Sequence, residues 1–315
     1  MKKIMAILLL VSIVTVMLTA CNTSDITTTN RNSEINLPPN PTDADYLQYI
    51  YEVNSSYFGS DETFNHKNVV SKSTHKSIDE KAPLMQTVKI NGLMKELNYE
   101  NTLYYPVQDY KVHCYSINDQ EDCKVLIRED GSIFAILNDF DKIDILQTNT
   151  PEEVLPKIKE VVEQYVDLSR YKYIDMPYDS SKDEGGIGFG NYTFEFYNLV
   201  DGYKTDYLMI SVDYFGNVYG LKIIDLRQHI TELNIDKKLE DKLLELKFRD
   251  IFTTDKIEYI SYKIDDRFFP QVVTREDGIY ISYAGSARYT IKDTGQEIKS
   301  FLVEVLIPLD LITSK

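Results

Sequence analysis

Two-residue turns of the Asn-Gly and Asp-Gly type recur between runs of alternating apolar residues, and they constrain how this chain can fold more than any other feature. Asn91-Gly92 precedes Leu93–Tyr99, and Asp130-Gly131 lies between Cys123–Glu129 and Ser132–Leu137. Such dipeptides accept the positive φ angles of tight β-hairpin turns. Parallel strands would need crossovers of a dozen or more residues. The pattern therefore predicts antiparallel neighbouring strands.

Apolar periodicity predicts the remaining elements. Helices are expected from Pro151 to about Leu168 and over Asp236–Phe248, where apolar residues recur at helical spacing. Thr42 can cap a short helix, although a strand suits its tyrosines equally well. Further strands are expected at Tyr110–Ile117, Tyr171–Tyr178, Tyr192–Leu199, Asp206–Tyr214, Val218–Asp225, Lys256–Ile264, Val272–Arg275 and Ile279–Tyr283, with a last hairpin between Arg288–Ile291 and Phe301–Ile307.

An internal repeat runs through this pattern. Ile127–Ile136 aligns without gaps on Val212–Leu221. Upstream, Tyr110–Ser116 is similar to Tyr192–Asn198, at a slightly shorter separation whose difference is assigned to a loop. A recurring separation of this kind is the mark of repeated supersecondary units.

These observations predict an α+β protein of two or three antiparallel β-meander modules, each with at most one packed helix. The expected divisions are a β-rich module over residues 43–148, a helix-plus-sheet module over 149–231 and another over 232–315. The third carries one strand more than the repeat requires, so its equivalence to the other two is left open.

The hairpin register leads to a prediction about Cys114 and Cys123. If Asn118-Asp119 is the turn, the two cysteines lie directly opposite each other as a non-hydrogen-bonded pair, with Cα atoms about 4.5 Å apart. That separation is at the short edge of what a disulfide accepts. Two interpretations stay open: a cross-strand disulfide, or two buried thiols. A metal site is not expected, since His113 points to the other face.

The first residues predict where the protein works. Lys2 and Lys3 precede an apolar run, Ile4–Leu18, which is too short to span a bilayer comfortably. It ends in Leu18-Thr19-Ala20-Cys21, which resembles the lipobox of bacterial lipoproteins. The resemblance implies removal of residues 1–20 and attachment of diacylglycerol to Cys21. Residues 21–42, polar and proline-containing, are expected to form a flexible tether.

Composition limits the partners. The chain has 50 acidic and 34 basic residues, a formal net charge of −16. An acidic surface repels phosphate backbones, so nucleic acid is not an expected partner. For the same reason, attachment to the membrane is expected through lipid on Cys21 rather than through a basic surface.

Several motifs are similar to catalytic or ligand sites but lack an essential part of each. Ser73-Thr74-His75-Lys76 has the spacing of a penicillin-binding nucleophile but lacks the companion motifs. Gly185–Gly190 lacks the strand-then-helix context of a dinucleotide loop. Asp139, Asp141 and Asp144 fail the calcium-loop spacing. The histidines are scattered, at His66, His75, His113 and His229. Neither a cofactor nor a metal is expected.

The helix-then-meander unit around the repeated hairpin resembles the PepSY-type modules of bacterial envelope proteins, with a cystatin-like helix on a sheet as the alternative. We expect an extracytoplasmic, membrane-anchored lipoprotein that acts as a non-catalytic binding module for an envelope protein, a peptide or a glycan. A PepSY-like regulator of an envelope peptidase or sensor is the alternative, and an enzyme of unrecognised type the second. The tyrosines of a stacking surface would be Tyr104, Tyr105, Tyr203, Tyr207, Tyr280 and Tyr283, unless they simply fill strands.

Overall fold

The computed structural model describes residues 37–52, 74–82, 85–118, 120–137, 149–177, 191–213, 216–224, 230, 232–266, 268–300 and 302–313. Strands make up 51% of it and helices are few, so the protein is mostly β. Contacts divide the chain into two compact units. Unit 1 comprises Met1–Ser73, Asn234–Phe268 and Asp277–Lys315, and unit 2 comprises Thr74–Leu233 and Phe269–Glu276. The three-module division expected from the sequence stays a prediction.

Unit 2 contains a sheet whose strands follow in the order β2-β4-β5-β6-β7-β11-β10, with β9 and β8 continuing beyond β10. All these pairs are antiparallel, β3 pairs with β4, and β13 is parallel to β10. The strands are β2 (Lys76–Ile78), β3 (Met85–Ile90), β4 (Leu93–Tyr105), β5 (Tyr110–Ile117), β6 (Gln120–Arg128), β7 (Ile133–Leu137), β8 (Tyr173–Asp175), β9 (Asn191–Val200), β10 (Tyr203–Asp213), β11 (Val218–Ile224) and β13 (Gln271–Arg275).

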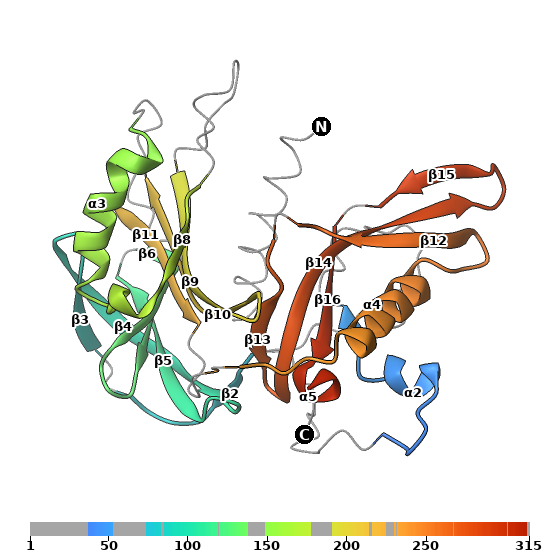
Figure 1. Ribbon diagram of the computed structural model, residues 1–315. Helices are drawn as coiled ribbons and strands as arrows, with labels where there is room; N and C mark the ends of the chain where they lie inside the picture. Colours follow the sequence, from blue (N-terminus) through green and yellow to red (C-terminus); the bar gives the residue numbers. More distant parts are fainter. Residues whose placement is uncertain are drawn as a thin grey trace. The chain divides into compact units, whose positions relative to one another are not determined.

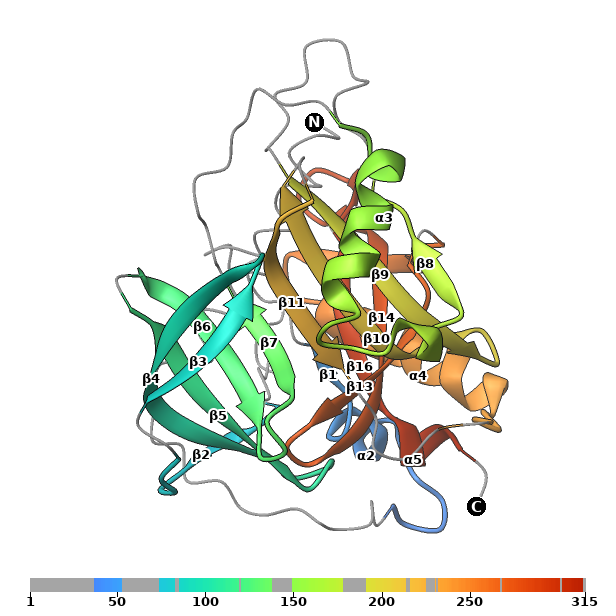
Figure 2. The ribbon, with the colours of Figure 1, turned by 90° about the vertical axis from the view of Figure 1, so that its left-hand side faces the viewer.

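One helix, α3 (Pro151–Val162), lies along a face of this sheet (Figure 2). It begins as the sequence predicts, because Thr150 and Glu153 form a reciprocal capping box. Val154, Ile158 and Val162 are buried in the core of unit 2. The helix ends at Val162, short of the predicted Leu168. The short 3₁₀ helix η4 (Leu168–Arg170) follows, so the apolar stripe continues without a regular α-helix.

The two hairpins of the repeat have the same register. Ile127 pairs with Ile133 and Val125 with Ile136, while in the second copy Val212 pairs with Val218 and Ile210 with Leu221. In both hairpins the register shifts at the equivalent position, and this shift is a β-bulge. Both turns place a glycine at positive φ, +83° at Gly131 and +81° at Gly216. A side chain is strained there, so the Gly in each copy is required by the backbone.

A two-residue turn at Asp130-Gly131 would oppose Ile127 to Phe134, and this pairing is wrong because of the bulge. A turn at Gly216-Asn217 would oppose Val212 to Leu221 and Ile210 to Ile223, and both pairings are wrong because Asn217 already pairs with Asp213. The backbone instead closes a longer turn, in which Arg128 N–H donates to Ser132 O at 2.9 Å and Asp213 N–H donates to Asn217 O at 3.1 Å. In the first hairpin the extra residue shifts only the partners nearest the turn, and Val125 pairs with Ile136, as predicted. In the second hairpin Ile210 pairs with Leu221 rather than with Ile223.

A second bulge makes the predicted pairing of the two cysteines wrong. Ile117 pairs with Gln120, so only residues 118–119 separate the strands, as predicted. The next pair is Ser116 with Lys124, because residues 121–123 are extra on that strand. Cys114 is therefore opposite Leu126, not Cys123. Both cysteines are buried thiols in the structure.

The same bulge also makes the upstream part of the predicted repeat alignment wrong. Ser116 pairs with Lys124, and Glu195 pairs with Met209, which is the counterpart of Lys124 in the second copy. Ser116 therefore corresponds to Glu195, not to Asn198 as sequence similarity predicts. The stretch from Glu195 to Met209 is longer than the stretch from Ser116 to Lys124, so the additional residues lie in the second copy.

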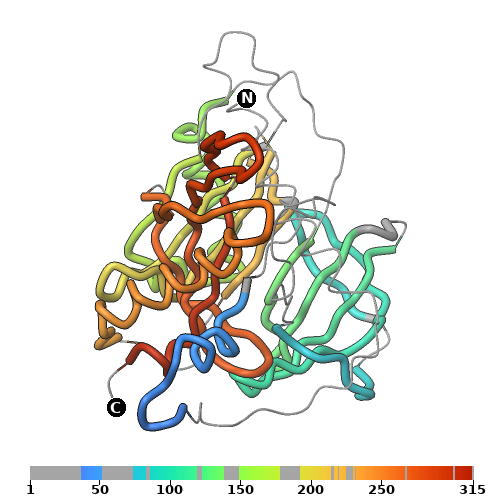
Figure 3. The backbone as a smooth tube through the Cα atoms, turned by 90° about the vertical axis from the view of Figure 1, so that its right-hand side faces the viewer, coloured from blue at the N-terminus to red at the C-terminus, as the bar shows by residue number. Residues whose placement is uncertain are grey.

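Unit 1 is built on the long strand β14 (Gly278–Ile291), shown in orange-red in Figure 1. One edge of β14 pairs with β12 (Ile257–Ile264). The other edge pairs first with β16 (Val303–Pro308) and then with β15 (Gln296–Lys299). β1 (Tyr51–Glu52) adds to the far side of β16, and Figure 3 shows this blue segment beside the red C-terminal strands.

This arrangement corrects the last predicted hairpin. Arg288–Ile291 pairs with Gln296–Lys299 through a tight turn ending at Gly295, not with Phe301–Ile307. β16 pairs instead with Tyr280–Gly285. β14 is 14 residues long, so β16 and β15 can pair with it one after the other. The apolar pattern of the sequence does not show that these residues form one continuous strand.

Helix α4 (Lys237–Ile251) packs on this sheet, and α2 (Asp43–Leu47) packs on α4. The predicted cap of α2 is present, since Thr42 and Asp45 form a capping box. Lys242 on α4 pairs with Asp43 at 3.1 Å and lies 4.8 Å from the centroid of the Tyr46 ring. The contact holds the N-terminal segment in unit 1.

Candidate functional site

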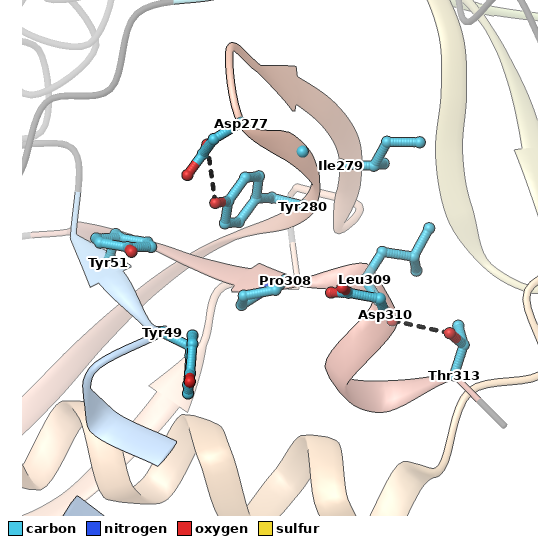
Figure 4. Close-up of a pocket in the computed structure, with 10 residues that line it drawn as sticks. Tyr49, Tyr51, Asp277, Ile279, Tyr280, Pro308, Leu309, Asp310 and Thr313 are labelled. Carbon is cyan, nitrogen blue, oxygen red and sulfur yellow. Dashed lines mark hydrogen bonds between the residues drawn. The ribbon is translucent and has the colours of Figure 1, made fainter. Parts of the chain in front are cut away.

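A pocket of about 270 Å³ opens at one end of β14 in unit 1 (Figure 4). Three segments of unit 1 that are distant in sequence form it: the connection into β1, the start of β14, and the end of β16 with the short helix α5 (Leu309–Ile312). Its lining consists of Tyr49, Tyr51, Asp277, Gly278, Ile279, Tyr280, Pro308, Leu309, Asp310 and Thr313.

Strand pairing brings the aromatic rings of the pocket together. Tyr51 is opposite Leu306 on one side of β16, and Tyr280 is opposite Pro308 on the other side. Positions two apart on a strand share a face, so the two tyrosines lie close to each other. Their ring centroids are 6.0 Å apart and the ring planes cross at 71°. An edge-to-face contact of this kind is a favoured aromatic geometry.

Two carboxylates stand beside these rings. The Tyr280 hydroxyl donates to Asp277 Oδ1 at 3.0 Å, drawn as a dashed line in Figure 4. Asp310 lies across the pocket on α5 and is exposed. Burial of Tyr280 raises the pKa of its hydroxyl, and the negative charges of Asp277 and Asp310 raise it further. Tyr280 therefore stays protonated at neutral pH and acts as a donor.

The hydroxyl group of Thr313 also belongs to the lining of the pocket. It donates to the carbonyl oxygen of Leu309 at 3.0 Å within the single turn of α5. The Tyr280 and Thr313 hydroxyls thus both donate to acceptors of the protein. The described lining includes no lysine, arginine or histidine. The pocket is therefore aromatic and acceptor-rich, with negative charge at two sides.

Of the six tyrosines singled out in the sequence, Tyr280 alone lines this pocket. Tyr105, Tyr203 and Tyr283 are also buried, at 7%, 2% and 2% exposure, and contribute to the cores rather than to a stacking surface. Sequence reasoning missed Tyr49 and Tyr51. An available signal was their spacing of two residues after a capped helix, which is typical of one face of a strand.

A second polar cluster lies in unit 2 around Lys204. Its ammonium is 2.8 Å from Asp175 Oδ2 and 2.7 Å from Glu195 Oε2, and it lies 4.2 Å from the centroid of the Tyr197 ring. The Tyr197 hydroxyl donates to Asp175 Oδ1 at 2.7 Å. Burial lowers the pKa of Lys204, but the two carboxylates outweigh it and the pKa is raised. Lys204 is therefore a charged structural anchor rather than a base.

The remaining candidates of the sequence do not converge. His113 Nδ1 is 2.9 Å from the Thr102 hydroxyl, and His75 Nδ1 is 2.9 Å from the Thr74 hydroxyl. Within the described ranges, no three His, Cys, Asp or Glu side chains gather as metal ligands would. Outside those ranges lie Cys21, Ser73, His66, His229, the triad Asp139, Asp141 and Asp144, and the loop Gly185–Gly190.

Among the helices that the structure describes, none is long and apolar enough to cross a bilayer. No family model, curated protein or solved structure matches the chain.

Proposed function

We propose that this protein is a lipoprotein anchored through Cys21 on the extracytoplasmic face of the cell membrane, and that it acts there as a non-catalytic binding module. The tyrosine-lined pocket of unit 1 is its ligand site. The pocket is the observation that carries the proposal, because it combines rings and acceptors in a concave site. The titratable groups of its lining are the carboxylates of Asp277 and Asp310 and the phenols of Tyr49, Tyr51 and Tyr280.

The anchoring half of the proposal rests on the sequence alone. The apolar run ends at Leu18-Thr19-Ala20-Cys21, and the polar residues 22–42 would hold the folded part off the bilayer. Two acyl chains are needed for stable attachment, because a single chain binds reversibly. We expect mass spectrometry of the mature N-terminus to find diacylated Cys21. Cys21→Ser should move the protein from the membrane fraction to the soluble fraction. An unmodified Cys21, or a membrane-bound Cys21→Ser variant, would contradict anchoring.

The binding half is tested by a ligand screen on the detergent-solubilised chain. Peptides, glycans and small charged compounds would be scored by their effect on the melting temperature. Tyr51→Ala removes a ring from the pocket, whereas Tyr173→Ala removes a ring that is 45% exposed in unit 2. We expect ligands that stabilise the wild type and Tyr173→Ala but not Tyr51→Ala. Ligands that stabilise all three proteins equally would place the site elsewhere.

The alternative function is regulation of an envelope peptidase or sensor by PepSY-like modules. The register shared by the two hairpins supports a repeated β-hairpin unit, on which this alternative rests. Crosslinking on intact membranes, followed by pull-down, separates the two functions. A regulator should be recovered with a peptidase or sensor, and pocket variants such as Tyr51→Ala should not change that recovery.

A further inference from the structure

The size of the pocket in unit 1 limits what it can hold. Ligand sites for drug-sized molecules have volumes of about 300–1,000 Å³. At about 270 Å³ the pocket lies just below that range. It therefore suits one small group, such as a single side chain or a head group, and is too small for several sugar rings. A glycan would need the extended groove that the lining does not form.

The charge of the pocket selects among small groups. Asp277 and Asp310 contribute carboxylates, and the described lining includes no basic side chain. An anionic group would be repelled from both sides. The whole chain, with a net charge of −16, adds to the same field.

The hydrogen bonds of the pocket also limit the kind of ligand that fits it. Tyr280 donates its hydroxyl hydrogen to Asp277, and Thr313 donates its own to Leu309. A neutral polyol uses both donors and acceptors on the protein, and these two donors are already engaged. The lining otherwise presents the carboxylates of Asp277 and Asp310 and the side chains of Tyr49 and Tyr51. Such surfaces match a group that is positive and only donates, or that has no hydrogen-bonding hydrogens at all.

The rings supply the remaining argument. Tyr49, Tyr51 and Tyr280 line one small cavity, and Tyr51 and Tyr280 meet at 71° rather than face to face. Aromatic rings attract ammonium ions to their electron-rich faces, and three tyrosines and two carboxylates line this one cavity. We propose that this pocket binds an organic ammonium group. The inference rests on the proposed function, since it takes this pocket as the ligand site.

The ammonium group has two chemical sources that share this recognition. One is a quaternary head group of the choline type, and the other is a primary amine, such as a lysine side chain. The quaternary group depends on the ring faces, and the primary amine depends more on the carboxylates, to which it can donate hydrogen bonds.

The experiment titrates the mature, maltoside-solubilised chain with four probes: choline, n-butylammonium and their neutral counterparts 3,3-dimethylbutanol and n-butanol. Tyrosine fluorescence and calorimetry report binding, because the chain has no tryptophan. We expect at least one ammonium probe to bind at least tenfold more tightly than its neutral counterpart. Asp277→Asn combined with Asp310→Asn should reduce that affinity at least tenfold. Tyr280→Phe, which keeps the ring, should change it less than Tyr51→Ala.

Asp266→Asn is the matched control, since the Asp266 side chain is 80% exposed in the same unit and lies outside the pocket. It should bind as the wild type does. Circular dichroism must be unchanged in each variant, and the conservative Asp→Asn changes keep the side-chain volume. Preference for choline identifies a quaternary head group, and preference for n-butylammonium identifies a primary amine.

Two results overturn the inference in distinguishable ways. If a neutral counterpart binds as tightly as its ammonium probe, and Tyr51→Ala abolishes that binding, the ammonium specificity is wrong while the pocket remains a ligand site. If neither the four probes nor the wider ligand screen gives binding that Tyr51→Ala abolishes, the pocket is not a ligand site, and the proposed function fails with it.

Discussion

At the scale of single residues, Lys222 is held in an environment that disfavours its charge. It lies on β11 opposite Met209 on one side and Ala135 on the other, so both strand neighbours are apolar. Burial lowers the pKa of Lys222 to about 8, and the positive charge of Arg275 contributes to the shift. The chain thus holds a lysine that loses its proton well below the pH at which an exposed lysine does.

Replacing this lysine should stabilise the protein. Lys222→Met keeps the length of the side chain and removes the charge, so we expect the free energy of unfolding to rise by about 1–3 kcal/mol at pH 7. Lys89→Met, on an exposed position of β3, is the control and should change it by less than about 0.5 kcal/mol. Urea unfolding of each variant measures the effect. A destabilised Lys222→Met would show that the ammonium makes a favourable interaction.

The pH dependence of stability tests the same residue. The unfolded chain has a lysine pKa near 10.5 and the folded chain a pKa of about 8 at Lys222. Between these values the unfolded state binds the proton and the folded state does not, so stability rises with pH. We expect this rise between pH 8 and about 10, and its loss in Lys222→Met. The measurement is the urea midpoint at a series of pH values.

The cysteines give a prediction that depends on register. Cys114 is opposite Leu126, and Cys123 lies within the bulge that precedes Lys124, so neither is placed for a straight cross-strand bridge. We expect thiol titration of denatured, unreduced protein to find two thiols in the mature chain, with Cys21 consumed by lipid. A count of zero would establish the disulfide that direct pairing of Cys114 with Cys123 predicts.

At the scale of elements, the side chain of Phe248 on α4 packs against the backbone of β14 at Gly285. A Cβ atom there would lie 2.7 Å from Phe248 Cζ and 3.1 Å from the carbonyl oxygen of Lys263. Phe248 is fully buried and stacks on Tyr262 with ring centroids 4.9 Å apart, so its ring has little room to move. The absence of a side chain at Gly285 is what lets the helix pack on this sheet.

Gly285→Ala should therefore destabilise unit 1. Overpacking of a filled core costs about 1–3 kcal/mol, and we expect a loss of stability in that range. Gly278→Ala is the control on the same strand, because its nearest neighbour would be at 3.7 Å, an ordinary contact. Thermal unfolding compares the two. Equal melting temperatures would show that Phe248 can shift at little cost.

At the scale of the whole molecule, buried tyrosine hydroxyls should make the protein less stable at alkaline pH. Burial raises the pKa of Tyr197, Tyr259 and Tyr280, and a neighbouring carboxylate raises each further. A raised folded pKa gives stability that is present below the unfolded value, near 10, and is lost as the pH rises above it. These residues lie in both units, so the loss should affect the chain as a whole.

We expect a spectrophotometric titration in which a fraction of the 24 tyrosines ionises only when the chain unfolds above pH 10. Absorbance of tyrosinate and circular dichroism should change together for that fraction. Smooth ionisation of all tyrosines near pH 10 with the circular dichroism retained would contradict this account. In Lys222→Met the same alkaline transition should persist, which separates the phenols from the lysine.

The sequence by itself determined the local features of this protein. The Asn91-Gly92 turn, the caps at Thr42 and Thr150, and the two matching hairpins of the repeat follow from interactions within a few positions of each other. Such interactions depend on residue type and spacing, which a sequence displays directly. The mostly β character of the chain followed from them.

The tertiary structure alone decided register and the pocket. Period-two alternation does not show where a bulge inserts extra residues, so the partner of Cys114 could not be counted from the turn. The pocket joins Tyr51, Tyr280 and Asp310, which come from the beginning and the end of the described chain. No local rule connects them, because pairing across β16 brings them together, and strand order in a sheet is settled by packing of the entire unit.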